Sequence, residues 1–109
     1  MRWNARARLE FSAACRELFD SNPAAAMDWQ ENVLRMTEML ENHPQIGHLF
    51  RHDHDGEIRQ IVVGRYRLIY LFDGMKRLEM CRVWHVRRDH NPMVIRDGPR
   101  RGWPAFVGY

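Results

Sequence analysis

Hydrophobic residues recur at helical spacing through residues 6–42, with charged and polar residues between them. The first stripe predicts a helix over roughly residues 6–20, with Ala7, Phe11, Ala14, Cys15, Leu18 and Phe19 on one face. Asn22 is a good N-cap and Pro23 a good first helical residue, so a second helix is expected from residue 23 to about residue 42. Its predicted buried face holds Ala26, Trp29, Val33, Met36 and Leu40. A short turn between the two helices predicts an antiparallel hairpin.

The pattern changes near residue 57 to short runs of β-branched and aromatic residues, which favour strands. Residues 44–57 are polar and are interpreted as a loop. Three strands are predicted at residues 58–63, 66–72 and 78–84, with turns at Gly64-Arg65 and Asp73-Gly74. With a short N-terminal strand, the elements predict an α+β fold. In this fold the helix hairpin packs on an antiparallel sheet of three to four strands, whose central strand lies near residues 65–72.

The last part of the chain, residues 91–109, has a different composition. It is rich in residues that break regular structure: Pro92, Pro99, Pro104, Gly98, Gly102 and Gly108. We therefore assign a folded domain to residues 1–90 and an irregular tail to residues 91–109. The tail interleaves basic and aromatic residues, a pattern that can contact nucleic acid. The interpretation we favour is that its aromatic residues pack on the surface of the domain itself.

The length of 109 residues fits one domain, and 45% hydrophobic with 28% charged residues is typical of a soluble globular protein. This composition excludes a disordered or collagen-like chain. No apolar run approaches the ~20 residues of a membrane helix, and we expect neither a signal peptide nor membrane contact. Two cysteines, Cys15 and Cys81, cannot form a disulfide framework. We therefore expect a cytoplasmic protein with reduced thiols.

Charge is distributed unevenly along the chain. Residues 1–57 carry six arginines against ten acidic residues, whereas residues 58–109 carry ten arginines and Lys76 against four acidic residues. The first part therefore has a net charge of −4 and the second a net charge of +7. Such asymmetry indicates a basic face that meets an acidic partner, either a polyanion or an acidic protein.

Residues 48–57 hold several His and Asp side chains, which suit a transition metal. Neighbouring positions in a loop do not fix the geometry of metal ligands. We interpret the segment as a solvated polar loop, and we assign no metal and no cofactor to the chain.

Two motifs stand in the predicted sheet: Gly-x-Tyr-Arg-x-x-Tyr at residues 64–70 and Val-x-His-x-Arg-Arg-Asp at residues 83–89. With Trp-Asn-Ala-Arg-Ala at 3–7, Asn-Pro-Ala-Ala at 22–25 and Pro-Gln-Ile-Gly at 44–47, they make residues 1 to about 90 resemble the RelE/ParE superfamily of bacterial toxins. The resemblance implies the toxin of a type II toxin–antitoxin pair, also called a plasmid stabilisation system, which inhibits growth and is neutralised by a cognate antitoxin. A homodimer or a toxin–antitoxin hetero-oligomer would be its assembly.

The superfamily has two branches, one of which cleaves mRNA on the ribosome (RelE-like) while the other binds DNA gyrase (ParE-like). For the nuclease, the resemblance places Arg67 at a phosphate-binding position and Arg87 just after the last strand, and His85 is a candidate general base. The expected Lys pair is absent, because residues 58–61 read Ile-Arg-Gln-Ile, and Pro92-Met93-Val94 stands near the expected Tyr. The chain therefore resembles the ParE-like branch more closely.

We accordingly expect a toxin that acts by binding a cellular target such as DNA gyrase. The alternative is a RelE-like endoribonuclease that uses His85, Arg67 and Arg87, and a second alternative is an inactive relative that binds only its antitoxin. The basic residues assigned to target or antitoxin binding are Arg59, Arg65, Arg82 and Arg88. Strand alternation puts some of these on opposite faces of the sheet, so they define a basic edge and not a pocket. His85 is equally well interpreted as a half-buried structural histidine.

Overall fold

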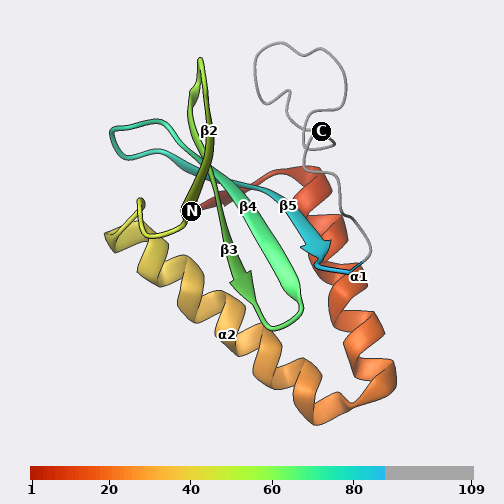
Figure 1. Cartoon of the computed structure of the whole chain (residues 1–109). Helices are drawn as coiled ribbons and strands as arrows, with labels where there is room; N and C mark the ends of the chain where they lie inside the picture. Colours follow the sequence, from red (N-terminus) through yellow and green to blue (C-terminus); the bar gives the residue numbers. More distant parts are fainter. Residues whose placement is uncertain (88–109) are drawn as a thin grey trace.

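The computed structural model describes residues 1–87 and contains two helices and one five-stranded sheet. The elements are β1 (Arg2–Trp3), α1 (Ala5–Ser21), α2 (Pro23–Asn42), β2 (His48–Asp53), β3 (Gly56–Val63), β4 (Tyr66–Phe72) and β5 (Leu78–His85). The strand order is β1-β5-β4-β3-β2, with β1 parallel to β5 and every other pair antiparallel. The helix hairpin packs on one face of the sheet (Figure 1). The α+β fold with its N-terminal strand, helix hairpin and central β4 is confirmed.

A single residue, Asn22, ends the first helix and begins the second. Its backbone N–H donates to the carbonyl oxygen of Leu18 at 2.8 Å, and its side-chain oxygen accepts from the N–H of Ala25 at 3.2 Å. Pro23 then occupies the first turn of α2, where its missing N–H costs no hydrogen bond. At the other end of α1, the Asn4 side chain caps the helix by accepting from the N–H of Ala7 at 2.8 Å. These local contacts explain why the predicted helix bounds are confirmed.

The main core lies between the hairpin and the sheet, and a row of rings in contact with one another crosses it. Consecutive ring centroids are 5.2 Å, 5.4 Å, 4.9 Å and 5.1 Å apart along the row Trp3, Phe11, Trp29, Tyr66 and His85. The row joins β1, both helices, β4 and β5. The indole N–H of Trp29 donates to the carbonyl oxygen of Val63 at 2.8 Å, so the buried polar group of the ring is satisfied.

The predicted buried face of α1 is wrong at one residue, because Phe19 is 55% exposed. At 3.6 residues per turn it lies about 120° around the helix from Ala7, which is fully buried. Phe19 therefore sits at the margin of the stripe and points largely to solvent.

The expectation of a loop over residues 44–57 is also wrong, because β2 pairs with β3 from His48↔Gln60 to Asp53↔Gly56. This pairing gives the sheet five strands where three to four were expected. Within the described sheet β2 is an edge strand, with β3 as its neighbour on one side, and it exposes the side chains of His48 and His52. Polar residues are therefore tolerated there, and for this reason the pattern of hydrophobic residues does not predict the strand.

The segment before β2 is fixed by Tyr70 on the central strand. The Tyr70 hydroxyl donates to the carbonyl oxygen of Pro44 at 2.8 Å and accepts from the N–H of Gly47 at 3.0 Å. A Cβ atom at residue 47 would collide with this hydroxyl, so the glycine is required by close approach. The structure thereby explains the Pro-x-x-Gly stretch at residues 44–47.

Candidate functional site

Arg67 lies near the start of β4, the central strand of the sheet, on the face opposite the helices. Its neighbours Tyr66 and Leu68 point into the helix-side core, so alternation places Arg67 on the other face. We call this the outer face. There Arg67 is cross-strand partner to Val62 on β3 and to Trp84 on β5. The Arg67 guanidinium donates to the side-chain oxygen of Gln60 at 3.2 Å, so this half-buried cation is held between an aliphatic and an aromatic neighbour.

His85 lies on the helix side of the sheet, at the end of β5. Its ring meets that of Tyr66 edge to face, with centroids 5.1 Å apart and an interplanar angle of 81°. Its Nδ1 accepts a hydrogen bond from the backbone N–H of Arg87 at 3.1 Å, which leaves Nε2 to carry the proton of the neutral ring. Arg67 and His85 are therefore on opposite faces of the sheet, although Tyr66, the partner of His85, is the residue next to Arg67.

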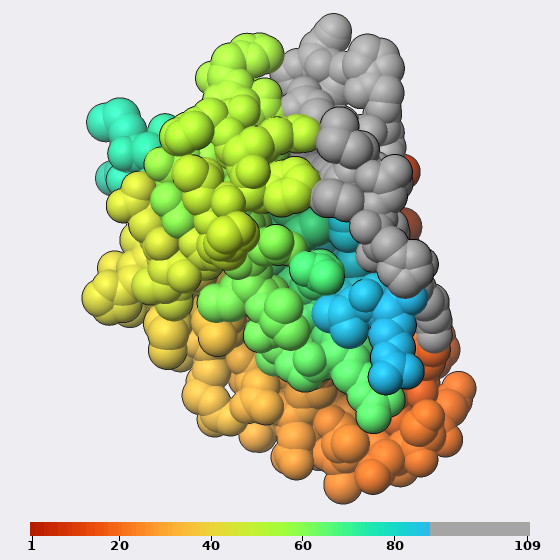
Figure 2. Space-filling view, viewed as in Figure 1, coloured from red at the N-terminus to blue at the C-terminus, as the bar shows by residue number. Residues whose placement is uncertain are grey.

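Arg65, His85 and Arg87 meet at one end of the sheet. The backbone N–H of Val86 donates to the carbonyl oxygen of Arg65 at 2.8 Å, which ties the β3–β4 turn to the end of β5. Figure 2 shows this end of β5, in blue, against the green surface of the turn. Arg65 and Arg87 are exposed and His85 is half-buried. We call these three residues the basic rim.

Arg59, assigned from the sequence to partner binding, has partners within the chain. Its Nε donates to Glu57 at 2.8 Å, and its Nη1 donates to the carbonyl oxygens of Gln45 at 3.0 Å and Gly47 at 2.6 Å. The hydrogen bond from Arg59 holds the pKa of Glu57 below its usual value. Arg59 thus fastens the loop before β2 to the sheet.

Arg82 is also engaged within the chain, by Glu10 on α1. The Arg82 Nη2 and a Glu10 carboxylate oxygen are 2.8 Å apart, and the guanidinium carbon lies 4.5 Å from the centroid of the Trp84 ring. The other carboxylate oxygen of Glu10 accepts from the backbone N–H of Val83 at 2.8 Å. Because β1 pairs with β5 only at Glu79 and Met80, Glu10 satisfies a part of the β5 edge that β1 does not reach.

The fourth basic residue, Arg88, and the predicted tail over 91–109 lie outside the described residues. The His- and Asp-rich residues 48–57 form the β2–β3 hairpin. Within residues 1–87, no three His, Cys, Asp or Glu side chains are grouped so that they could hold a metal ion. No helix of this part of the chain combines the length and the apolar composition that crossing a bilayer requires.

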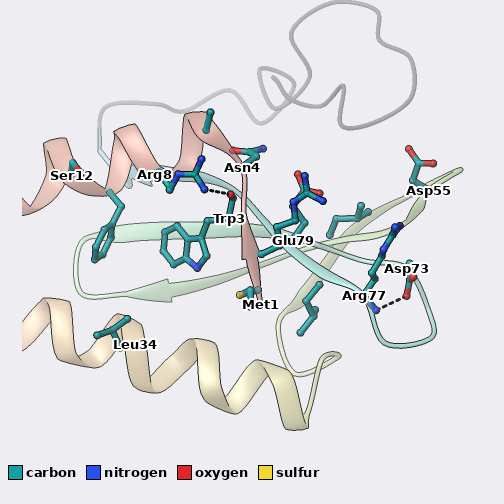
Figure 3. Close-up of a pocket in the computed structure, with 15 residues that line it drawn as sticks. Met1, Trp3, Asn4, Arg8, Ser12, Leu34, Asp55, Asp73, Arg77 and Glu79 are labelled. Carbon is teal, nitrogen blue, oxygen red and sulfur yellow. Dashed lines mark hydrogen bonds between the residues drawn. The ribbon is translucent and has the colours of Figure 1, made fainter.

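A groove of about 1120 Å³, which the sequence pattern does not predict, runs along β1. Figure 3 shows β1 crossing its middle, with Leu34 of α2 at one end and the β4–β5 turn at the other. Its apolar surface includes Leu34, which is 54% exposed, together with Trp3 and Phe11. The exposed charged residues of the groove are Arg2, Arg8 and Arg77. Its acidic residues are half-buried, and they are Asp55, Asp73 and Glu79.

Two of the three acidic residues, Asp73 and Glu79, interact with other groups of the chain. One carboxylate oxygen of Asp73 accepts from three backbone N–H groups of the turn that follows it, and these hydrogen bonds lower the pKa of Asp73. Burial raises the pKa of Glu79, which faces Arg2 as its cross-strand partner. The groove therefore presents an apolar surface rimmed by exposed cations. The residues that line it come from many separate elements, so no local sequence signal could have found it.

Comparison with known proteins agrees with this architecture. No curated protein matches the chain. A family model for the ParE toxin of the type II toxin–antitoxin system parDE matches residues 1–90, which is most of the 109-residue chain. The chain therefore belongs to the ParE toxin family and is the toxin of a type II toxin–antitoxin pair, with an antitoxin as its partner.

Proposed function

We propose that this toxin inhibits growth in the cytoplasm by binding a protein target such as DNA gyrase, and that it does not cleave RNA. The observation that carries the proposal is the placement of Arg67 and His85 on opposite faces of the sheet. The absence of the Lys pair from residues 58–61 supports it.

In-line cleavage of RNA needs a base for the 2′-hydroxyl, an acid for the leaving oxygen and cations around the same phosphate. A phosphate held by Arg67 on the outer face is separated from His85 by the backbone of β4 and β5. Losing one such group typically costs ~10²–10³ in rate, and in this chain the base and the phosphate-binding cation do not face each other. The geometry therefore favours binding over catalysis.

The target contacts that we propose are the exposed arginines of the basic rim, Arg65 and Arg87. Arg59 and Arg82 form ion pairs with Glu57 and Glu10, respectively. The exposed basic rim is therefore the better candidate for contact with a charged partner. The net charge of +7 over residues 58–109 would steer an acidic surface toward this part of the molecule.

For the antitoxin we propose an acidic, amphipathic segment that lies in the groove along β1. Its apolar side chains would contact Leu34, Trp3 and Phe11, while its acidic side chains would meet Arg8 and Arg77. This site is separate from the basic rim, because the two are built from different residues.

Two assays on the purified toxin test the proposal: supercoiling by DNA gyrase, and mRNA cleavage coupled to translation. We expect inhibited supercoiling and intact mRNA. Codon-positioned cuts that vanish in a His85→Ala variant would instead identify a ribosome-dependent endoribonuclease. No effect in either assay would favour a relative that binds only its antitoxin, or a toxin whose target is another protein.

A further inference from the structure

Large apolar residues lie on the side of the helix hairpin that faces away from the sheet. They are Leu9 and Phe19 on α1 together with Met27 and Leu34 on α2, and each is more than half exposed. We call these four residues the hairpin patch. At 100° per residue, each lies about 120–160° around its helix from a fully buried residue, Ala7 on α1 or Leu40 on α2. Soluble monomers seldom leave such a patch open to water, so it is a candidate contact surface.

The two helices carry this patch as one continuous surface with borders of opposite charge. Leu34 of α2 lines the same groove as Arg8 of α1, so the exposed flanks of the helices adjoin. Arg8 and Arg16 share the exposed side of α1 with its patch residues, and Glu31 and Glu38 share that of α2. A surface with a basic half and an acidic half is complementary to a copy of itself.

We propose that a second copy of this chain docks on the hairpin patch and forms a two-fold symmetric dimer. The two-fold axis bisects the V that α1 and α2 form in Figure 1. This axis lays α1 of each copy along α2 of the other, in the antiparallel sense, so the basic half of each copy meets the acidic half of the other. Packing α1 on α1 would instead bring like charges together.

The heights of the apolar residues along the hairpin agree with this arrangement. Height is counted from the helix junction at Asn22, and a two-fold axis along the hairpin leaves it unchanged. At 1.5 Å per residue, Leu9 and Leu34 lie about 20 Å and 18 Å from the junction. Phe19 and Met27 lie about 5 Å and 8 Å from it. Apolar residues of one copy therefore meet apolar residues of the other at both levels.

The charged residues match in the same way. Arg16 and Glu31 lie about 9 Å and 14 Å from the junction, and Arg8 and Glu38 lie about 21 Å and 24 Å from it. Each pair agrees to within one helical turn of about 5.4 Å, which long side chains span. Because the interface is symmetric, each pairing occurs twice.

The size of this face fits a reversible dimer. Helices of 17 and 20 residues are roughly 26 Å and 30 Å long and about 10 Å wide, so each copy offers roughly 550 Å². Two copies would bury about 1,100 Å², close to the lower limit for a biological interface. We therefore expect a dimer that forms at micromolar concentration and dissociates on dilution.

The dimer would change which surfaces of the toxin are accessible. The basic rim is built from the sheet and stays outside the interface. Leu34 and Arg8 also line the groove proposed for the antitoxin, so a second copy and the antitoxin would exclude each other. This consequence rests on the proposed antitoxin site, whereas the dimer itself does not.

Sedimentation equilibrium of the purified full-length toxin over roughly 1–100 μM tests the apolar part of the interface. The double variant Phe19→Ser/Met27→Ser should raise the dimer dissociation constant at least about tenfold. The matched control is Val62→Ser/Met75→Ser, which alters two exposed apolar residues of the sheet and its β4–β5 turn and should stay within about twofold of the wild type. A wild type that is monomeric throughout, or equal weakening by both double variants, would overturn the proposal.

A charge exchange tests the symmetry of the interface. Arg16 and Glu31 are the residues to exchange, because Arg8 also donates to the carbonyl oxygen of Trp3 at 2.9 Å. Arg16→Glu and Glu31→Lys should each weaken self-association about fivefold, since each places like charges opposite each other twice. An equimolar mixture of the two variants should recover the dimer to within about twofold of the wild type, which also shows that both variants fold. A mixture that associates no better than either variant alone would contradict the arrangement.

Discussion

Glu10 and Arg82 are 72 positions apart in the chain and form an ion pair that joins α1 to β5. The pair does more than link two charges, because Glu10 also accepts the backbone N–H of Val83. The Glu10 carboxylate thus orients the Arg82 side chain over Trp84, and it also accepts a hydrogen bond from the backbone at the edge of β5. This relationship holds the helix hairpin against the sheet beyond the reach of β1.

Replacing Glu10 with Ala should lower the free energy of unfolding by about 2 kcal/mol, because it removes the Glu10 hydrogen bonds to a nearly buried guanidinium and to a backbone N–H. Urea unfolding followed by circular dichroism measures the effect. The control is Glu38→Ala on the exposed side of α2, which should change stability by less than about 0.5 kcal/mol. Equal effects of the two substitutions would show that the Glu10 contacts add nothing to stability.

Replacing Tyr70 with Phe should cost about 1–2 kcal/mol at neutral pH, since the hydroxyl bonds both Pro44 and Gly47. The cost should shrink at alkaline pH. Burial raises the pKa of Tyr70 above its ordinary value of 10.0, so above pH 10 the unfolded wild type ionises before the folded form does.

The wild type therefore loses stability as the pH rises from the unfolded to the folded pKa of Tyr70, whereas the Tyr70→Phe variant lacks this loss. Urea unfolding of both proteins at pH 7 and at pH 11 measures the difference. A gap between wild type and variant that widens at pH 11 would contradict the assigned direction of the shift.

Much of the hairpin could be predicted because its signals are local. Asn22 and Pro23 mark the helix junction within two residues, and the stripe around Trp29 needs only helical spacing. β2 could not be predicted in the same way, because its polar residues become a strand only through pairing with β3. The basic residues illustrate the same limit. From the sequence, Arg82 is interpreted as a surface charge. Its contact with Glu10 forms only in the folded chain, and neither sequence spacing nor composition predicts that contact.

Antitoxin association should depend on the arginines of the groove. An Arg77→Gln variant should bind its antitoxin with an on-rate about two- to fivefold lower at low salt, and the difference should fade as salt rises. Stopped-flow or surface-plasmon kinetics across a salt series would measure this. Arg35→Gln, an exposed position of α2 outside the groove lining, is the matched control. A wild-type on-rate that is independent of salt would refute charge steering.

Target binding should depend on the basic rim. The double variant Arg65→Glu/Arg87→Glu should lose at least about tenfold in inhibition of its target while keeping the urea midpoint of the wild type, because both side chains are exposed. Growth arrest on induction and inhibition of gyrase supercoiling are the two readouts. Arg16→Glu, at an exposed position of α1, should leave both unchanged. Undiminished inhibition by the double variant would place the target elsewhere on the molecule.

The central claim is that this fold acts by binding, since Arg67 and His85 point to opposite faces of the sheet. The most direct measurement is translation-coupled mRNA cleavage, with wild-type toxin beside the His85→Ala and Arg67→Ala variants and with gyrase supercoiling assayed in parallel. We predict intact mRNA for all three proteins and supercoiling that the wild type inhibits. Codon-positioned cleavage by the wild type that is lost in both variants would contradict the account, because it would require the two side chains to act on one phosphate.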